Sequence, residues 1–338
     1  MIVVIVFASA AICYGLIVLL FPLLQRHMTV VPSERSSHSH PTPQGGGIAV
    51  VAATLAVAGV ALAAIDGLAG SPHVLASLAA AMIAIATLGA LDDVVSLPVV
   101  PRLAVQAICV SLVVVALGWE GITADNAIRS AAGAAVIIIA WLWFVNLTNF
   151  MDGLDWLTVA AVTPVTAALM LFGAAGFADL PTTVVAASLT GALIGFAPFN
   201  RPAAKLFLGD AGALPIGLLV GWMLLSLVRS GGVTAAAILP LYYVADASVT
   251  VASRALRGER PWQAHRGHFY QRANVNGLSA LRISAHIFCL NCALALLAAV
   301  TLISPVTVVH VAAMAAAVGL VAVSLWRFSC SGQPSADS

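Results

Sequence analysis

A short polar stretch, Asn146–Trp156, separates two apolar runs in the middle of the chain. Asp152 and Asp155 stand three positions apart, so on one helical turn both carboxylates share a face with Asn149. Two carboxylates and an amide at the end of a hydrophobic helix are costly unless a cation neutralises them. The stretch predicts a divalent metal that carries a phosphorylated ligand. A hydrophilic loop between two membrane spans is the alternative.

The composition predicts an all-α integral membrane protein. Hydrophobic residues make up 62% of the 338 residues and charged residues only 8%, whereas a soluble domain has about 25% charged residues. We expect about 10–11 transmembrane helices in a single membrane domain, residues 1–326, followed by a short tail, 327–338. Apolar runs of nearly membrane-spanning length lie at residues 1–24, 46–65, 73–91, 103–118, 130–145, 158–177, 182–199, 211–228, 233–251, 280–303 and 306–326.

The distribution of basic residues predicts the orientation. Of the 14 Lys and Arg residues, all but Arg129 and Arg229 fall in one alternating set of loops, in the tail or at the entrance of a span. Positive charge is retained on the cytoplasmic side. We therefore expect these loops to be cytoplasmic and the N-terminus to lie outside. The net charge of +1 gives no sign of a nucleic-acid partner.

Three of the predicted cytoplasmic segments carry residues suited to phosphate or metal binding. The Gly-rich entrance at Gly46 would let backbone N–H groups approach an anion, although such an entrance is usually only a turn. Asp92 and Asp93 end the third run, and at most one of two adjacent acids points into a site. Arg102 opens the fourth run, where it contacts either lipid headgroups or a phosphate.

Two later segments add an acid and a histidine motif. Asp210 lies between glycines at the start of a span, where it either reaches a metal-bound ligand or caps the helix. His265, Arg266 and His268 suit a nucleotide diphosphate, although a basic flank beside a membrane often contacts only acidic lipid. Asp246 is an acid inside an apolar run and is functional by default, unless it pairs with Arg254.

The acids of these loops are expected at one membrane face, opposite many arginines. Acidic residues, Mg²⁺ and arginine are the groups that phosphoryl-transfer sites use, because catalysis there is mainly positioning and charge neutralisation. The apolar remainder implies a substrate that itself lies in the bilayer. The acids concerned are Asp92, Asp93, Asp152, Asp155 and Asp210.

Five motifs in one order resemble the polyprenyl-phosphate N-acetylhexosamine-1-phosphate transferase superfamily (glycosyltransferase family 4). The version of the last motif is most similar to bacterial enzymes that start O-antigen or other surface-polysaccharide units. The motifs are Pro-Ser-Glu-Arg-Ser-Ser-His with Pro-Thr-Pro-Gln-Gly-Gly-Gly, Leu91-Asp92-Asp93, Asn149-x-x-Asp152-Gly-x-Asp155, Phe207-Leu-Gly-Asp-Ala-Gly212 and His265-Arg-x-His268.

The resemblance implies transfer of a sugar-1-phosphate from a UDP-N-acetylhexosamine to undecaprenyl phosphate in the bacterial inner membrane. The products are undecaprenyl-diphospho-sugar and UMP, and the cofactor is Mg²⁺ or Mn²⁺. A homodimer is an open alternative to a monomer. The step would initiate a cell-envelope polysaccharide, such as lipopolysaccharide.

The resemblance also implies roles for individual residues. Asp210 and Asn149 would hold the metal. Asp92 would orient or deprotonate the lipid phosphate, with Asp93 assisting. The remaining predicted site residues would contact nucleotide or metal (Asp152, Asp155), a phosphate (Arg102, Gly46) or the sugar-phosphate end (His265, Arg266, His268).

Three departures from the family pattern bear on this interpretation. Trp156 replaces the usual glycine after Asp155, and Leu214-Pro215 stands where serine and small or aromatic residues are usual; both bear on pocket shape. The histidine motif lacks a doubled histidine, which bears on sugar identity. The alternative functions are a secondary transporter and an inactive scaffold for polysaccharide assembly. Transport is disfavoured because the acids lie at the ends of spans, without an internal repeat.

Overall fold

Long helices form wherever apolar residues run without interruption, because in a bilayer each backbone N–H must find its acceptor within the segment. The computed structural model describes residues 1–30, 41–64, 72–118, 127–259 and 266–330, without the side chains of 127–130. Its elements are α1 (Ile2–His27), β1 (Thr29–Val30), β2 (Thr42–Pro43), α2 (Gly46–Ala63), α3 (Pro72–Val95), α4 (Val99–Ala116), α5 (Ala127–Phe150), α6 (Leu157–Ala174), α7 (Leu180–Asn200), α8 (Asp210–Arg229), α9 (Val233–Ile238), α10 (Leu241–Leu256), α11 (Phe269–Val275), α12 (Ala280–Ile303) and α13 (Thr307–Cys330).

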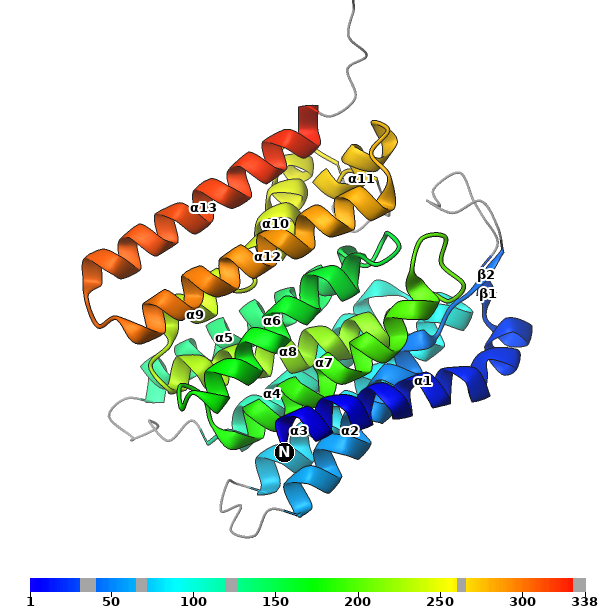
Figure 1. Cartoon of the computed structure of the whole chain (residues 1–338), viewed down its shortest axis with the longest axis horizontal. Helices are drawn as coiled ribbons and strands as arrows, with labels where there is room; N and C mark the ends of the chain where they lie inside the picture. The colour runs from blue at the N-terminus through cyan, green and yellow to red at the C-terminus, as the bar shows by residue number, and fades with distance from the viewer. Residues whose placement is uncertain (31–40, 65–71, 119–126, 260–265, 331–338) are drawn as a thin grey trace, which may run out of the picture.

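Ten of these helices are long and apolar enough to cross a membrane, within the described ranges. The predicted all-α membrane fold is therefore confirmed, and the only departure in the described residues is the two-residue antiparallel ladder of β1 and β2. Figure 1 shows the helices running in broadly the same direction, with α12 and α13 side by side.

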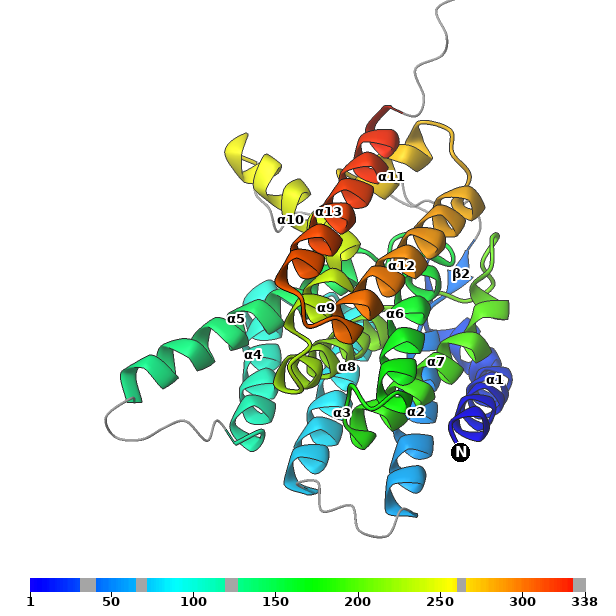
Figure 2. The same ribbon diagram turned by 60° about the vertical axis from the view of Figure 1, so that its left-hand side comes forward.

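The expected span at 233–251 is wrong as a continuous helix. It is divided into α9 and α10 at Leu239–Pro240. Proline lacks the N–H that a continuous helix would need at position 240, and its ring crowds the preceding turn, which explains the interruption at this point. Figure 2 shows α10 leaning away from the neighbouring long helices, and its last residue, Leu256, is 89% exposed.

Helices α7 and α8 form the centre of the bundle. In their apolar windows 78% and 83% of the residues are buried. Helix α7 packs against α1, α2 and α6, whereas α8 packs against α2, α3 and α5. Small residues such as Ala187, Ser188 and Gly191 allow neighbouring backbones to approach α7 closely.

The start of α8 is fixed by close backbone contacts with two other helices. A Cβ on Gly47 of α2 would lie 2.2 Å from the Cα of Gly212, and one on Gly89 of α3 would lie 2.3 Å from the carbonyl oxygen of Asp210. Any side chain larger than hydrogen would push these helices apart. The glycines therefore determine where Asp210 lies.

Helix α13 continues to Cys330, past the expected domain end at residue 326. Phe328 is 1% exposed and packs against His286 of α12, with ring centroids 5.1 Å apart. Residues 331–338, most of the predicted tail, lie outside the described part of the chain.

Candidate active site at one end of the helix bundle

The first turn of α8 is capped by an acid from α3. The Asp93 carboxylate accepts hydrogen bonds from the backbone N–H groups of Asp210, at 3.0 Å, and Ala211, at 3.2 Å. These N–H groups have no partner inside their own helix, and a negative charge is favourable at a helix N-terminus. Gln44 donates to the Asp93 backbone carbonyl at 2.7 Å. Asp93 thus connects the end of α3 to the start of α8.

Asp210 is surrounded by side chains from three other helices. Asn149 of α5 donates to Asp210 Oδ2 at 3.0 Å, and Arg102 Nη1 of α4 lies 3.5 Å from the same oxygen. Arg102 also forms an ion pair with Asp92, whose other oxygen accepts from the Leu97 N–H at 2.6 Å. The structure brings together the predicted metal residues, Asp210 and Asn149, with the predicted phosphate residue, Arg102.

The polar loop after α5 supplies the remaining acids. Thr158 donates a hydrogen bond to Asp152, and Asp155 accepts one from the Ala204 N–H at 3.0 Å. Burial and, secondarily, the nearby Asp93 carboxylate raise the pKa of Asp152 to about 7, although the Thr158 hydrogen bond opposes this rise. Asp152 is therefore a partly buried acid in a site with an excess of carboxylates.

These groups line a polar cavity of about 280 Å³. Three of its polar lining residues, Gln44, Asn200 and Gln271, were not anticipated as site residues. Gln44 directly precedes the predicted glycine-rich entrance. Gln271 lies three residues after His268, and this nearness to the histidine motif is the sequence signal that could have identified it. Asn200 ends α7 and has no such signal. The polar lining includes Gln44, Asp93, Asn149, Asp152, Asp155 and Asp210.

A second, apolar cavity of about 340 Å³ lies between α4, α5 and α10. Its lining includes Val99, Trp143, Phe150 and Val251, and Arg102 is its charged member. Because Arg102 contacts Asp92 and Asp210, it stands between an apolar and an acidic compartment.

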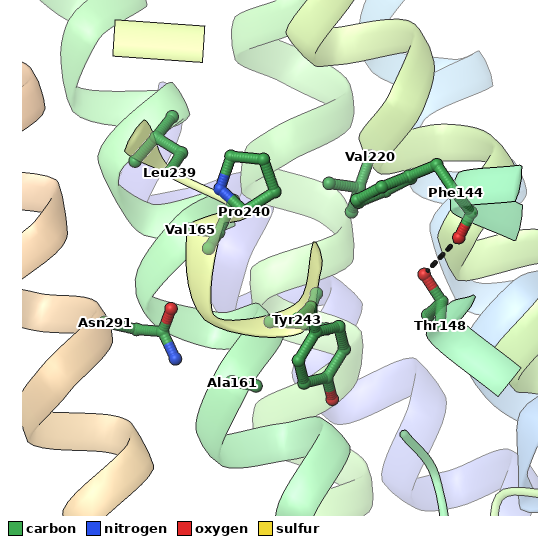
Figure 3. Close-up of a pocket in the computed structure, with 10 residues that line it drawn as sticks. Phe144, Thr148, Ala161, Val165, Val220, Leu239, Pro240, Tyr243 and Asn291 are labelled. Carbon is green, nitrogen blue, oxygen red and sulfur yellow. Dashed lines mark hydrogen bonds between the residues drawn. The ribbon is translucent and has the colours of Figure 1, made fainter. Parts of the chain in front are cut away.

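A third cavity, in the bundle interior, is far smaller, at about 20 Å³ (Figure 3). The figure shows Tyr243 and Asn291 at its edge, and Thr148 with its hydroxyl directed to the Phe144 carbonyl at 2.8 Å. A space of this size holds about one water molecule. It is too small for a nucleotide or a sugar.

The contacts of Gly46 contradict the expectation that N–H groups at the glycine-rich entrance of α2 face an anion. The N–H of Gly46 donates to the Phe207 carbonyl and that of Gly47 to the Leu208 carbonyl, both at 2.9 Å. A Cβ on Gly46 would lie 2.5 Å from the ring of Phe196. The glycine pair therefore joins the start of α2 to the segment before α8, because both donors are already used.

One residue of the histidine motif, His268, lies beneath the surface. His268 is 2% exposed, and its Nδ1 lies 3.2 Å from a carboxylate oxygen of Asp246. Arg266 is half-buried, and His265 lies outside the described residues. Arg254, the partner considered for Asp246, lies 3.3 Å from Glu259.

Trp156 explains one departure from the family pattern. Its φ of 64° lies in the left-handed region that favours glycine. Its backbone N–H donates to the Asn200 side chain at 2.9 Å, and its indole Nε1 donates to the Ala197 carbonyl at 2.7 Å. The ring thus attaches the acidic loop to the end of α7 and does not belong to the lining of the 280 Å³ cavity.

Comparison with known proteins supports the same conclusion as the motifs. Residues 75–228 match the family described as Glycosyl transferase family 4. The chain is 29% identical over 207 residues to decaprenyl-phosphate N-acetylglucosaminephosphotransferase of Mycolicibacterium smegmatis, covering 56% of this chain and 51% of that protein. It is 30% identical over 191 residues to phospho-N-acetylmuramoyl-pentapeptide-transferase of Leuconostoc mesenteroides, covering 52% and 59%.

These matches confirm the predicted relationship to the polyprenyl-phosphate N-acetylhexosamine-1-phosphate transferase superfamily. The chain spans about half the length of the curated relatives it matches. The matched family segment contains Asp92, Asp93, Arg102, Asp210 and the loop 149–155. Together with the ten long apolar helices of the described residues, the matches support a multi-pass membrane protein that is similar to sugar-phosphate transferases.

Proposed function

We propose that this protein transfers an N-acetylhexosamine-1-phosphate from a UDP-sugar to undecaprenyl phosphate. The products are undecaprenyl-diphospho-sugar and UMP, and the location is the bacterial inner membrane, with the site on the cytoplasmic side. The step initiates a cell-envelope polysaccharide. The names of the two relatives, one a decaprenyl-phosphate and one a phospho-N-acetylmuramoyl-pentapeptide transferase, support a polyprenyl phosphate acceptor and an amino-sugar donor.

The observation that carries this proposal is the position of Arg102. Its guanidinium group joins the apolar cavity between α4, α5 and α10 to the acidic cavity around Asp210. Its Nε is buried and has no hydrogen-bond partner among the described residues, which is costly unless a ligand supplies an acceptor. A prenyl chain suits the apolar side, and its phosphate suits the guanidinium.

The acidic cavity fits a divalent cation that is shared with substrate phosphates. Within the described ranges, no three acidic, histidine or cysteine side chains form a group that could hold a metal alone. Mg²⁺ in phosphoryl-transfer sites is usually bound through one or two carboxylates together with phosphate oxygens and water. The Asp210 carboxylate and the side-chain amide oxygen of Asn149 would hold the cation. The cation would neutralise charge on the pyrophosphate.

The residues of this chain would then orient the two substrates. Asp92 holds Arg102 in place, and Arg102 directs the lipid phosphate. An oxygen of that phosphate attacks the β-phosphorus of the UDP-sugar, and the bond from the β-phosphorus to the bridging oxygen breaks and releases UMP. A phosphate monoester has a second pKa near 6, so the acceptor is already largely dianionic at neutral pH. Orientation therefore contributes more than proton removal.

The decisive experiment supplies purified protein with labelled UDP-sugars, undecaprenyl phosphate and Mg²⁺, and identifies the lipid product. We expect one N-acetylhexosamine donor to give a diphospho-linked lipid and stoichiometric UMP. Asp210→Asn should lower the rate about 10²- to 10³-fold, as expected for loss of a key electrostatic group. Absence of lipid product with every donor would refute the proposed function. A burst of UMP without lipid would refute direct attack in favour of an aspartyl-phosphate route.

A further inference from the structure

Asp246 of α10 is a fully buried acid that contacts a distant segment of the chain. Its side chain is 0% exposed. Its carboxylate lies 3.2 Å from Nδ1 of His268, and it accepts hydrogen bonds from the backbone N–H groups of Phe269, at 3.1 Å, and Tyr270, at 3.3 Å. A carboxylate in α10 therefore fixes the backbone where α11 begins.

The remaining neighbours of this carboxylate are also donors. The hydroxyls of Tyr242 and Thr250, one helical turn before and after Asp246, lie 3.2 and 3.4 Å from its oxygens. A carboxylate is acceptor-only and has about four lone-pair sites, whereas asparagine would direct an NH₂ group at one of these donors. Aspartate therefore suits this set of donors better than asparagine, and burial makes each unmet donor costly.

The segment fixed by Asp246 is in contact with the acidic loop through Tyr270. This side chain is 0% exposed, and its hydroxyl donates to the backbone carbonyl of Phe150 at 3.0 Å. A Cβ on Gly153 would lie 2.2 Å from the same hydroxyl. Phe150 and Gly153 flank Asp152, and Asn149 immediately precedes Phe150. Tyr270 therefore touches the loop that carries two of the groups lining the acidic cavity.

We propose that Asp246 is a positioning residue for transfer: through Tyr270 it holds Asn149–Asp155, the end of α5 and the loop that follows, in the position in which Asn149 contacts Asp210. It touches neither substrate nor metal. This inference rests on the proposed function for its catalytic readout, but the contacts themselves can be tested by protein stability alone. Tyr270→Phe is an informative variant, because it removes only the hydroxyl that donates to the Phe150 carbonyl.

The first experiment tests whether Asp246 and Tyr270 act as one unit. We expect Tyr270→Phe to lower kcat about tenfold, the size of one lost buried hydrogen bond, with the KM for the donor sugar changed less than twofold. Asp246→Asn should lower kcat further, and the double variant should be no slower than Asp246→Asn alone. Losses that multiply would show independent residues and overturn the proposal. Asp179→Asn, which alters the cap of α7 instead, controls for loss of an aspartate outside the site and should leave kcat unchanged.

The second experiment uses the close approach of Gly153. Gly153→Ala should lower both activity and Tm, because its methyl group overlaps the Tyr270 hydroxyl. Adding Tyr270→Phe removes that oxygen, and the nearest remaining ring atom is 3.3 Å away. We therefore expect the double variant to exceed Gly153→Ala in both Tm and kcat, although each single change is harmful. A double variant worse than either single variant would refute the contact.

The two proposals fail separately. If the wild-type protein makes no lipid product from any donor, the proposed function fails, and the Tm values of the Gly153 and Tyr270 variants still test the contact. If the wild-type protein is active and Asp246→Asn matches it in kcat, the positioning role fails and the transferase stands.

Discussion

Trp156 shows how one residue departs from a family pattern without entering the cavity. Its positive φ would be relaxed in a glycine, and the hydrogen bond from the indole to the Ala197 carbonyl offsets that cost. The carbonyl lies in the last turn of α7, where helical acceptors lack intrahelical partners. The hypothesis of an inactive scaffold depends on a distorted site, and the position of the ring against α7 argues against such a distortion.

Trp156→Phe should therefore lower stability and leave chemistry largely intact. The lost hydrogen bond costs about 1 kcal/mol, and transferase activity should stay within severalfold of wild type. Thermal unfolding in detergent and the lipid-product assay measure the two effects. Trp156→Gly keeps the backbone conformation without the ring and is the matched variant. A turnover more than tenfold above wild type in Trp156→Gly would show that the indole impairs the site.

Asp152 gives the protein a pH dependence of stability that can be measured without substrates. Its pKa rises to about 7 in the folded protein, mainly because it is buried, whereas an unfolded aspartate has a pKa of about 3.9. At any pH between these two pKa values, Asp152 binds more protons in the folded state than in the unfolded state. Asp152 therefore favours folding fully only below about pH 4, and that contribution is lost as pH rises through 7.

We expect wild-type Tm to fall between pH 5 and 8 more steeply than the Tm of Asp152→Asn. The slope from this group is at most about 1.4 kcal/mol per pH unit. Added Mg²⁺ should flatten the wild-type curve, because a nearby cation favours the ionised carboxylate. Parallel Tm curves for the two proteins would contradict the raised pKa.

At the scale of elements, the site depends on how closely α2 and α3 approach α8. Asp210 begins α8, and Gly47 and Gly89 meet its first turn backbone to backbone. The sequence suggests an anion-binding entrance at Gly46. The N–H groups of Gly46 and Gly47 instead donate to the carbonyls of Phe207 and Leu208, a tertiary arrangement that the local sequence pattern does not specify.

Gly47→Ala should destabilise the protein and reduce activity, because its methyl group would overlap the backbone of Gly212 at 2.2 Å. Gly59→Ala is the control in the same helix, since no atom lies within 4 Å of its added Cβ. In a helix interior that exchange alone stabilises by up to about 1 kcal/mol. Opposite shifts in Tm for the two variants are the expected result, and equal shifts would contradict the close packing.

The interrupted ninth run is the clearest difference between expectation and structure. Hydropathy over 233–251 predicts one span, whereas Pro240 ends one helix and begins another. Within α10, four buried residues recur at four-residue steps: Tyr242, Asp246, Thr250 and Arg254. This polar stripe faces the protein, which explains why a helix containing a buried acid is stable.

At the scale of the whole molecule, the acids and Arg102 gather at one end of the bundle. Asp93, Asn149, Asp152 and Asp210 line one cavity although more than one hundred residues separate the first from the last. The side of the membrane on which this end lies stays a prediction from the positive-inside pattern.

Cysteine labelling tests that orientation. In a chain whose five native cysteines are replaced, a cysteine at Asn276, between α11 and α12, should be protected from an impermeant thiol reagent in sealed cells. A cysteine at Ala178, between α6 and α7 at the other end, should be labelled. Reversed labelling would place the acidic cavity outside and remove its access to a cytosolic nucleotide.

Composition and apolar run length were sufficient to predict an all-α membrane bundle, because a bilayer permits few backbone arrangements. The order of short polar motifs was sufficient to predict the similarity to the superfamily, and four of the five predicted acids, Asp93, Asp152, Asp155 and Asp210, line one cavity. Sequence could not decide which N–H groups are free, as at Gly46, nor that Asp246 would meet Tyr270, because these contacts join residues far apart in the chain. Such contacts exist only when helices have packed, and packing alone determines which polar groups remain available to a ligand.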